Sequence, residues 1–528
     1  MTSASRRRWL ALAATAPLAS SSWLLSGCAT TRADTVATVA PSKARSRAEV
    51  YRAVNAMTWG ATAKTVDHAL QIGYERYVDE QLRAQGGSTL PPTVQAQIDA
   101  LRIQSTPMAT LVTELEAARK SGEAADTEDA RKAAQQTFQQ DLSRLAREAA
   151  ARDLLRAVYS NDQLLEHMSW FWFNHFNLHQ YKANIRAMLG DYQEHAIRAH
   201  ALGRFRDLLG AVAHHPAMLI YLDNAQNAVN HINENYAREL LELHTLGVDG
   251  GYTQRDVQEL ARVLTGFGVN PSDKQPNVKR EWAGLYVRND LFEFNPNRHD
   301  FGDKLVLGRR IKGRGPAELD EVLDLIALHP STARFVSRKL ALYFLGDDPP
   351  QALVARMAGA YTASGGQIAA TLRMLLLSSE FTAPRPLAAQ KFKDPMHFVV
   401  SAVRASYEDK AILNTLPMQN WLNRMGEGLY NHQTPDGYPL TAADWTSSGQ
   451  MSTRFEIAKA IGNGSAGLFK TDEANPKEQP AFPQLANALY YETLRGVLGP
   501  DTRQALDQAA SPQEWNALLL SSPEFMYR

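Results

Sequence analysis

The sequence has almost no cysteine and no excess of charge of either sign. Cys28 is the single cysteine among 528 residues, which excludes a disulfide, a cysteine zinc site and a CxxCH haem motif. Lys and Arg together number 56, and Asp and Glu also number 56. A chain without a basic excess offers no general electrostatic surface for phosphate backbones, so nucleic acid is not a predicted partner.

Regular metal and nucleotide motifs are also missing. The sequence contains no HExxH, and none of its 14 histidines follows a Glu by three residues, which excludes zincin and carboxylate di-iron patterns. GNGSAG at residues 462–467 fits GxGxxG, but it follows a helical pattern instead of a strand. A dinucleotide fingerprint requires a strand before the glycines, so this stretch is predicted to be a turn.

The N-terminus has the pattern of an export signal. Three arginines at 6–8 precede an interrupted apolar run that ends in the tetrad LSGC, with Cys28 last. We predict a signal peptide over 1–27, a lipobox with lipidation at Cys28, and a flexible tether over 28–46. Ala29 after the cysteine indicates the periplasmic face of the outer membrane in a Gram-negative cell. SRRRWL also resembles a twin-arginine signal, so both the general and the twin-arginine export routes stay open.

The remaining chain is predicted to be mainly α, a multi-helical body with a small antiparallel β insertion. Apolar residues recur at three- and four-residue spacing except near residues 282–313, where apolar and polar residues alternate between Asn, Pro and Gly. Because single cores rarely exceed about 300 residues, we expect one large multi-layer body or two lobes, with an N-terminal helical lobe over 47–281 and a C-terminal one over 314–528. Residues 426–448 are predicted to form a long ordered loop.

FWFNHFNLH at 171–179 places His175 and His179 four residues apart. On one helix face this spacing lets two imidazoles reach one metal ion, although an aromatic helix with isolated histidines is more often structural.

A second cluster follows in a predicted helix that begins near Asn233 or Asn235. Glu234 and Arg238 fall at a four-residue step and predict an ion pair, with Glu239 about 100° away and His244 on the apolar side. A buried histidine near carboxylates is a candidate proton-transfer group, whereas helix caps and a surface charge ladder are the structural alternative.

The third cluster is NRHDFGDK, in a loop of the predicted β insertion. An adjacent His299 and Asp300 in a loop is poorly explained by core packing, so this pair is a candidate catalytic site.

Several long stretches resemble one bacterial family, catalogued as domain of unknown function number 1800. They are WFNHF, NENYARELLELHTLGVDGGYTQRDVQELARVLTGF, RHDFGDKLVLG, HPSTARFVSRKLALYFLGDD, KFKDPMHFVVSAVRA and LLLSSPEFMYR, in order from about residue 51 to 528. The resemblance implies an exported, largely helical protein, frequently encoded beside a second family, number 1501, that resembles sulfatases. It supports His175 and not His179, and it transfers no catalytic residue.

Two classes of function follow. In the first, the protein is an enzyme whose candidate catalytic residues are His175, Glu234, Arg238, Glu239, His299 and Asp300, working by acid–base chemistry or with a divalent metal on His175 and His299. In the second, it is a lipid-anchored binding or assembly partner of an exported sulfatase-like protein, and the same residues form buried pairing networks.

Overall fold

A computed structural model describes residues 45–272, 274–470 and 482–528. The predicted signal peptide, the lipidation site Cys28 and the predicted tether up to residue 44 lie outside the described residues. Among the described helices, none is both long and apolar enough to cross a membrane.

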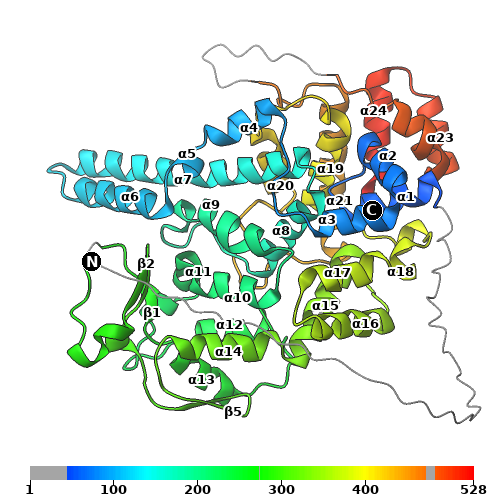
Figure 1. Ribbon diagram of the computed structural model, residues 1–528. Helices are drawn as coiled ribbons and strands as arrows, with labels where there is room; N and C mark the ends of the chain where they lie inside the picture. The colour runs from blue at the N-terminus through cyan, green and yellow to red at the C-terminus, as the bar shows by residue number, and fades with distance from the viewer. Residues whose placement is uncertain (1–44, 273, 471–481) are drawn as a thin grey trace, which may run out of the picture. The chain divides into compact units, whose positions relative to one another are not determined.

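The described chain is mainly α with a small β insertion, as predicted (Figure 1). The helices before the sheets are α1 (Arg47–Met57), α2 (Ala63–Ile72), α3 (Tyr74–Leu82), α4 (Pro92–Asp99), α5 (Arg102–Ser105), α6 (Met108–Glu123), α7 (Glu128–Tyr159), α8 (Gln163–His175), α9 (Leu189–Asp191), α10 (Phe205–His214), α11 (Pro216–Tyr221), α12 (Asn235–Glu242) and α13 (Gln254–Val263).

The helices after the sheets begin with α14. They are α14 (Ala317–Ala327), α15 (Pro330–Phe344), α16 (Gln351–Ala363), α17 (Ile368–Leu376), α18 (Ser379–Thr382), α19 (Pro395–Tyr407), α20 (Leu416–Arg424), α21 (Ser448–Gly462), α22 (Arg495–Val497), α23 (Pro500–Asp507) and α24 (Pro512–Ser521). Residues 426–441 before α21 form the predicted loop, and only a short 3₁₀ helix, Ala442–Trp445, follows in it.

The β insertion consists of two hairpins and one added strand. β2 (Val287–Asn289) and β3 (Phe292–Phe294) form the first hairpin, and β4 (Lys304–Val306) and β5 (Arg309–Ile311) form the second. β1 (Phe267–Val269) lies outside the predicted range 282–313 and pairs antiparallel with β3, which gives the order β1-β3-β2. A strand of three residues is too short to show a clear alternation of apolar and polar side chains, which explains why β1 is not evident in the sequence.

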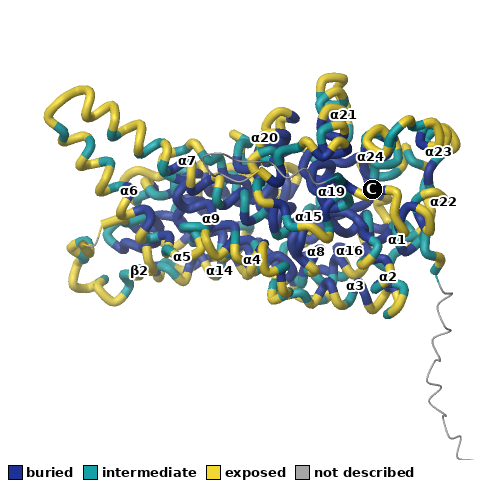
Figure 2. The backbone as a smooth tube through the Cα atoms, turned by 90° about the horizontal axis from the view of Figure 1, so that it is seen from above, coloured by how far each residue is buried: buried dark blue, intermediate teal, exposed yellow. Residues whose placement is uncertain are grey.

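Residues 45–528 form one compact unit, and helices from both predicted lobes pack on each other. α3 contacts α17, and α7 contacts α19. Figure 2 shows buried backbone through α8, α15 and α19 and an exposed tip where α6 turns into α7. The two lobes therefore share one core.

α8 is the most deeply buried of the described helices that carry candidate residues. Each residue from Gln163 to His175 is buried, because aromatic and apolar side chains surround the helix on all sides. The helix ends at His175, and its C-cap Phe176 leaves the helical conformation (φ −108°, ψ 53°). The expectation that His175 and His179 share one helix face is therefore wrong, because His179 lies beyond the end of α8.

Candidate functional site

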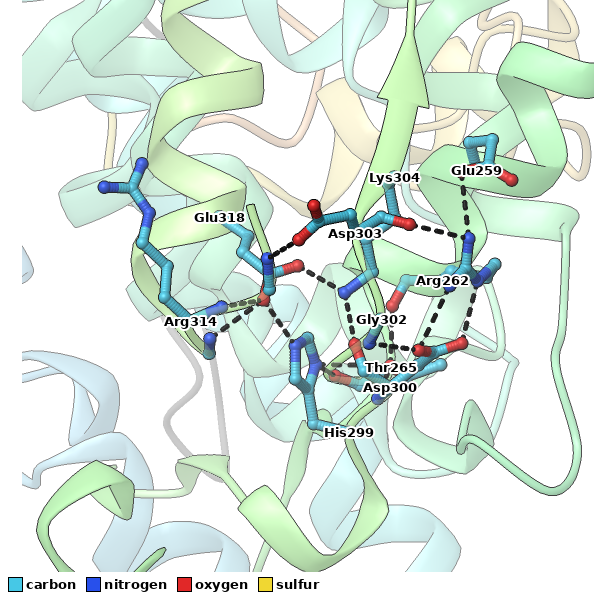
Figure 3. Close-up of polar contacts among 12 residues, drawn as sticks. Glu259, Arg262, Thr265, His299, Asp300, Gly302, Asp303, Lys304, Arg314 and Glu318 are labelled. Carbon is cyan, nitrogen blue, oxygen red and sulfur yellow. Dashed lines mark hydrogen bonds and ion pairs between the residues drawn. The ribbon is translucent and has the colours of Figure 1, made fainter. Parts of the chain in front are cut away.

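His299 lies in a closed buried network of hydrogen bonds (Figure 3). Its Nδ1 donates to the Thr265 carbonyl oxygen at 2.8 Å, and its Nε2 lies 2.9 Å from Glu318 Oε1. Glu318 also pairs with Lys304, and all three side chains are fully buried. Burial alone would raise the Glu318 pKa, but the bonds from His299 and Lys304 outweigh it and lower the pKa. Both ring nitrogens of His299 are thus occupied.

Asp300 lies in the loop that leads into the second hairpin. Its two carboxylate oxygens accept from Arg262 Nε at 2.8 Å and Arg262 Nη2 at 3.2 Å, and Oδ1 also accepts from the Gly302 amide at 2.8 Å. A bidentate guanidinium partner fixes a carboxylate strongly. Figure 3 shows His299 bonded to Glu318 in α14 and Asp300 bonded to Arg262 in α13, so the pair holds the hairpin against these two helices.

Glu234 and Arg238 form the predicted ladder at the start of α12. Arg238 Nη2 lies 3.3 Å from Glu234 Oε2, and Gln254 bonds to both side chains. These contacts are exposed or half-buried, as expected for a helix-surface pair of small energetic weight. Glu239 differs from them, because burial and the carboxylates of Glu242 and Asp436 raise its pKa.

The tautomer of His175 follows from its two contacts. Its Nε2 lies 3.0 Å from the carbonyl oxygen of His244, which can only accept, so Nε2 carries the hydrogen. Nδ1 therefore has a lone pair, and it lies 3.0 Å from Nζ of Lys339 in α15. The lysine donates to the imidazole. Burial keeps the His175 pKa well below its usual range, which makes the ring a neutral acceptor.

Lys339 is half-buried at the end of this hydrogen-bond chain. Burial lowers its pKa to about 8, against an opposing effect of the Asp436 carboxylate. About one in ten such amines is neutral at pH 7, compared with roughly one in three thousand for an ordinary lysine. Lys339 therefore has a usable population of nucleophilic, proton-accepting amine near neutral pH.

His244 lies behind the pair and is fully buried. Its ring centroid is 6.2 Å from that of His175, and neither of its ring nitrogens has a hydrogen-bond partner among the described residues. Burial lowers its pKa to about 3, so it is neutral. A buried imidazole without hydrogen-bond partners lowers the stability of the fold. Its presence here is therefore not explained by stability.

The loop at 431–438 covers the end of α8. Asn174 Nδ2 donates to the Tyr438 carbonyl at 2.9 Å, and Asn174 Oδ1 accepts from the Tyr438 amide at 2.6 Å. Gly437 has φ +76°, and a Cβ there would lie 2.0 Å from the Asn174 carbonyl oxygen. Only glycine fits this close approach, which brings Asp436 into electrostatic range of Lys339.

These residues form the lysine centre, which we define as His175, Glu239, His244, Lys339 and Asp436. Two of its members, His175 and Glu239, were predicted as site residues, and His244 was singled out as a proton-transfer candidate. Lys339 and Asp436 were missed. RKLALYF reads as an ordinary amphipathic stretch, and only the fold reveals that this lysine points to a histidine 164 positions earlier.

The structure supplies no ligand set for the predicted metal. Among the described residues, no group of three or more His, Cys, Asp or Glu is placed to hold an ion. His175 and His299 also have different hydrogen-bond partners, drawn from different elements.

A cavity of about 850 Å³ contains another cluster that the sequence analysis missed. Asp191 accepts from His195 Nδ1 at 2.8 Å and from His215 Nε2 at 3.1 Å, at the start of a π-helix, Tyr192–Ile197. π-helical turns often accompany functional positions. The four-residue spacing of Asp191 and His195 was the available signal. The His195 side chain is 70% exposed, so most of its surface is in solvent.

The fold and the lysine centre together define a helical protein with a buried lysine–histidine pair and no regular cofactor motif. The chain belongs to the family described as "Protein of unknown function (DUF1800)", which matches residues 52–527. This confirms the resemblance. No curated protein and no solved structure matches the chain.

Proposed function

We propose that this protein is an exported, lipid-anchored enzyme whose reactive group is the Lys339 amine, working by acid–base or nucleophilic chemistry without a requirement for His299. The observation that supports this most is a chain of two hydrogen bonds. Lys339 Nζ lies 3.0 Å from His175 Nδ1, and His175 Nε2 lies 3.0 Å from the His244 carbonyl oxygen. A reactive group bonded to a base that a third group orients is the arrangement of activated nucleophiles.

The two carboxyl groups complete the centre. Asp436 is an ionised neighbour that counteracts the burial of Lys339, and Glu239 has a raised pKa that favours its protonated form. A base and an acid whose pKa values are displaced toward neutrality are what proton transfer at pH 7 requires. The lipid anchor at Cys28 and the sulfatase-like partner stay predictions from the sequence and the family resemblance.

The test is competitive acetylation of the intact protein with trace acetic anhydride, followed by peptide mass spectrometry across pH. The Lys339 rate should rise with an apparent pKa near 8. Asp436→Asn should lower that pKa further, because it removes the charge that raises it. Asp444→Asn, an exposed change farther along the same loop, is the matched control and should leave it unchanged.

An apparent pKa for Lys339 like that of an exposed lysine such as Lys132 would refute the proposal. An Asp436→Asn variant with the same Lys339 pKa as the Asp444→Asn variant would also refute the proposal, because Asp436 would then have no electrostatic effect on Lys339.

A further inference from the structure

We infer that Lys339 binds a neutral aldehyde or ketone covalently as an imine, with His175 positioning the amine; this inference rests on the proposed function and names its substrate class. A primary amine that donates to a fixed acceptor has its lone pair directed away from that acceptor. Here the acceptor is His175 Nδ1, held by the His244 carbonyl, so the lone pair of the neutral Lys339 amine is left for an electrophile.

Lys339 lies between apolar and polar surroundings that suit this step. The Phe335 ring centroid is 5.6 Å from Nζ, and His175 and His244 are buried behind it. Partial exclusion of water favours imine formation, because the reaction releases water and because a desolvated lysine loses its proton more readily. Lys339 itself is only half-buried, so part of the residue remains in contact with solvent.

The step balances without an oxidant or a reductant. The neutral Lys339 nitrogen attacks the carbonyl carbon and a C–N bond forms, while one N–H proton passes through water to the carbonyl oxygen and gives the carbinolamine. The hydroxyl of the carbinolamine then takes up a proton from water, the C–O bond breaks and water leaves, and the nitrogen returns its second proton to water, so that the imine remains. One carbonyl compound and one amine give one imine and one water.

The charges around Nζ distinguish classes of carbonyl compound. The Asp436 side chain is 59% exposed, and the carboxylates of Asp436 and Glu242 lie close enough to Glu239 to raise its pKa. Arg238, the cation that acts on Glu239, is already paired with Glu234, with its Nη2 3.3 Å from Glu234 Oε2. A carbonyl compound that carries a carboxylate would therefore be repelled, whereas a neutral one would not.

Reductive trapping tests the inference on the intact protein. Glycolaldehyde, a neutral probe, and glyoxylate, its carboxylate counterpart, are each supplied with cyanoborohydride at pH 7.5, and the adducts are located by peptide mass spectrometry. With glycolaldehyde, Lys339 should be modified about tenfold faster than the exposed Lys132, since more of its amine is neutral. With glyoxylate that preference should fall severalfold. In Asp436→Asn the difference between the two probes should shrink.

Each of the other possible results contradicts either the imine, the class of substrate or the proposed function. If the acetylation of Lys339 shows a low apparent pKa but glycolaldehyde modifies Lys339 no faster than Lys132, the imine is refuted and the proposed function stands. If glyoxylate is preferred, the neutral class of substrate is wrong. If Lys339 shows neither low-pH acetylation nor trapping, both proposals fail. Lys339→Met, folded by circular dichroism, should lose this adduct and retain the one at Lys132.

Discussion

Individual side chains acquire their chemical character here from their neighbours. His175 and His299 are both buried histidines next to a polar residue in the sequence, yet they have opposite surroundings. His299 Nε2 is bonded to a carboxylate, whereas His175 Nδ1 accepts from an amine. The first is held by a hydrogen bond to a buried carboxylate, and the second is bonded to a lysine whose pKa is lowered by burial. The sequence predicted both as site residues, because residue type and sequence context were visible and partners in space were not.

The Lys339→Met variant should change the pH dependence of stability. Lys339 has a pKa of about 8 when folded and near 10.5 as an ordinary lysine. Between these values the unfolded state binds more protons, so wild-type stability rises with pH, and this rise is lost in the variant. Allowing for its partial exposure, the rise is roughly 2 kcal/mol.

Urea unfolding at pH 7.5 and pH 10 measures this effect. Lys132→Met on the exposed face of α7 is the matched control and should follow the wild type at both pH values. A Lys339→Met variant with the wild-type pH slope would show that Lys339 titrates normally.

At the level of elements, short segments hold the helices in place. The network of His299, Lys304 and Glu318 joins the β4 hairpin to α14, and Asp300 joins the same hairpin to α13 through Arg262. The β insertion was predictable from its alternation and turn residues. The end of α8 was not, because FWFNHFNLH has no helix-stopping residue before His179 and the chain leaves the helix to accommodate the loop at 431–438.

Glu318→Gln should therefore be strongly destabilising. It would leave the buried Lys304 ammonium without its carboxylate, at a cost of about 3–5 kcal/mol by chemical unfolding. Asp324→Asn on the same helix, where the carboxyl is 66% exposed, should cost less than about 1 kcal/mol. Where Glu318→Gln still folds, the Lys339 acetylation pKa should be unchanged; a shifted pKa would contradict the separation of the two clusters.

The whole molecule combines a compact helical unit over 45–528 with a predicted lipid anchor before it. No described helix is long and apolar enough to cross a membrane. The proposed attachment is the lipid at Cys28. Acyl chains at an N-terminal cysteine retain a protein on a membrane that the protein itself does not enter.

Cell fractionation tests this prediction. The full chain should sediment with outer membranes, and Cys28→Ser should move to the soluble periplasmic fraction or keep an uncleaved signal. Deleting residues 1–27 together with the cysteine should leave the protein in the cytoplasm. Unchanged membrane sedimentation of Cys28→Ser would contradict lipidation.

The sequence by itself determined the helical class, the site of the β insertion, the family and two members of the lysine centre. These depend on local periodicity, turn residues and extended motifs, each of which lies within a short stretch of the sequence. Only the tertiary structure decided that His175 meets Lys339 and not His299, and that Gly437 brings Asp436 to the same place. The physical reason is that a pKa and a hydrogen-bond partner depend on burial and on neighbours in space, which come from α8, α12, α15 and a loop far apart in the chain.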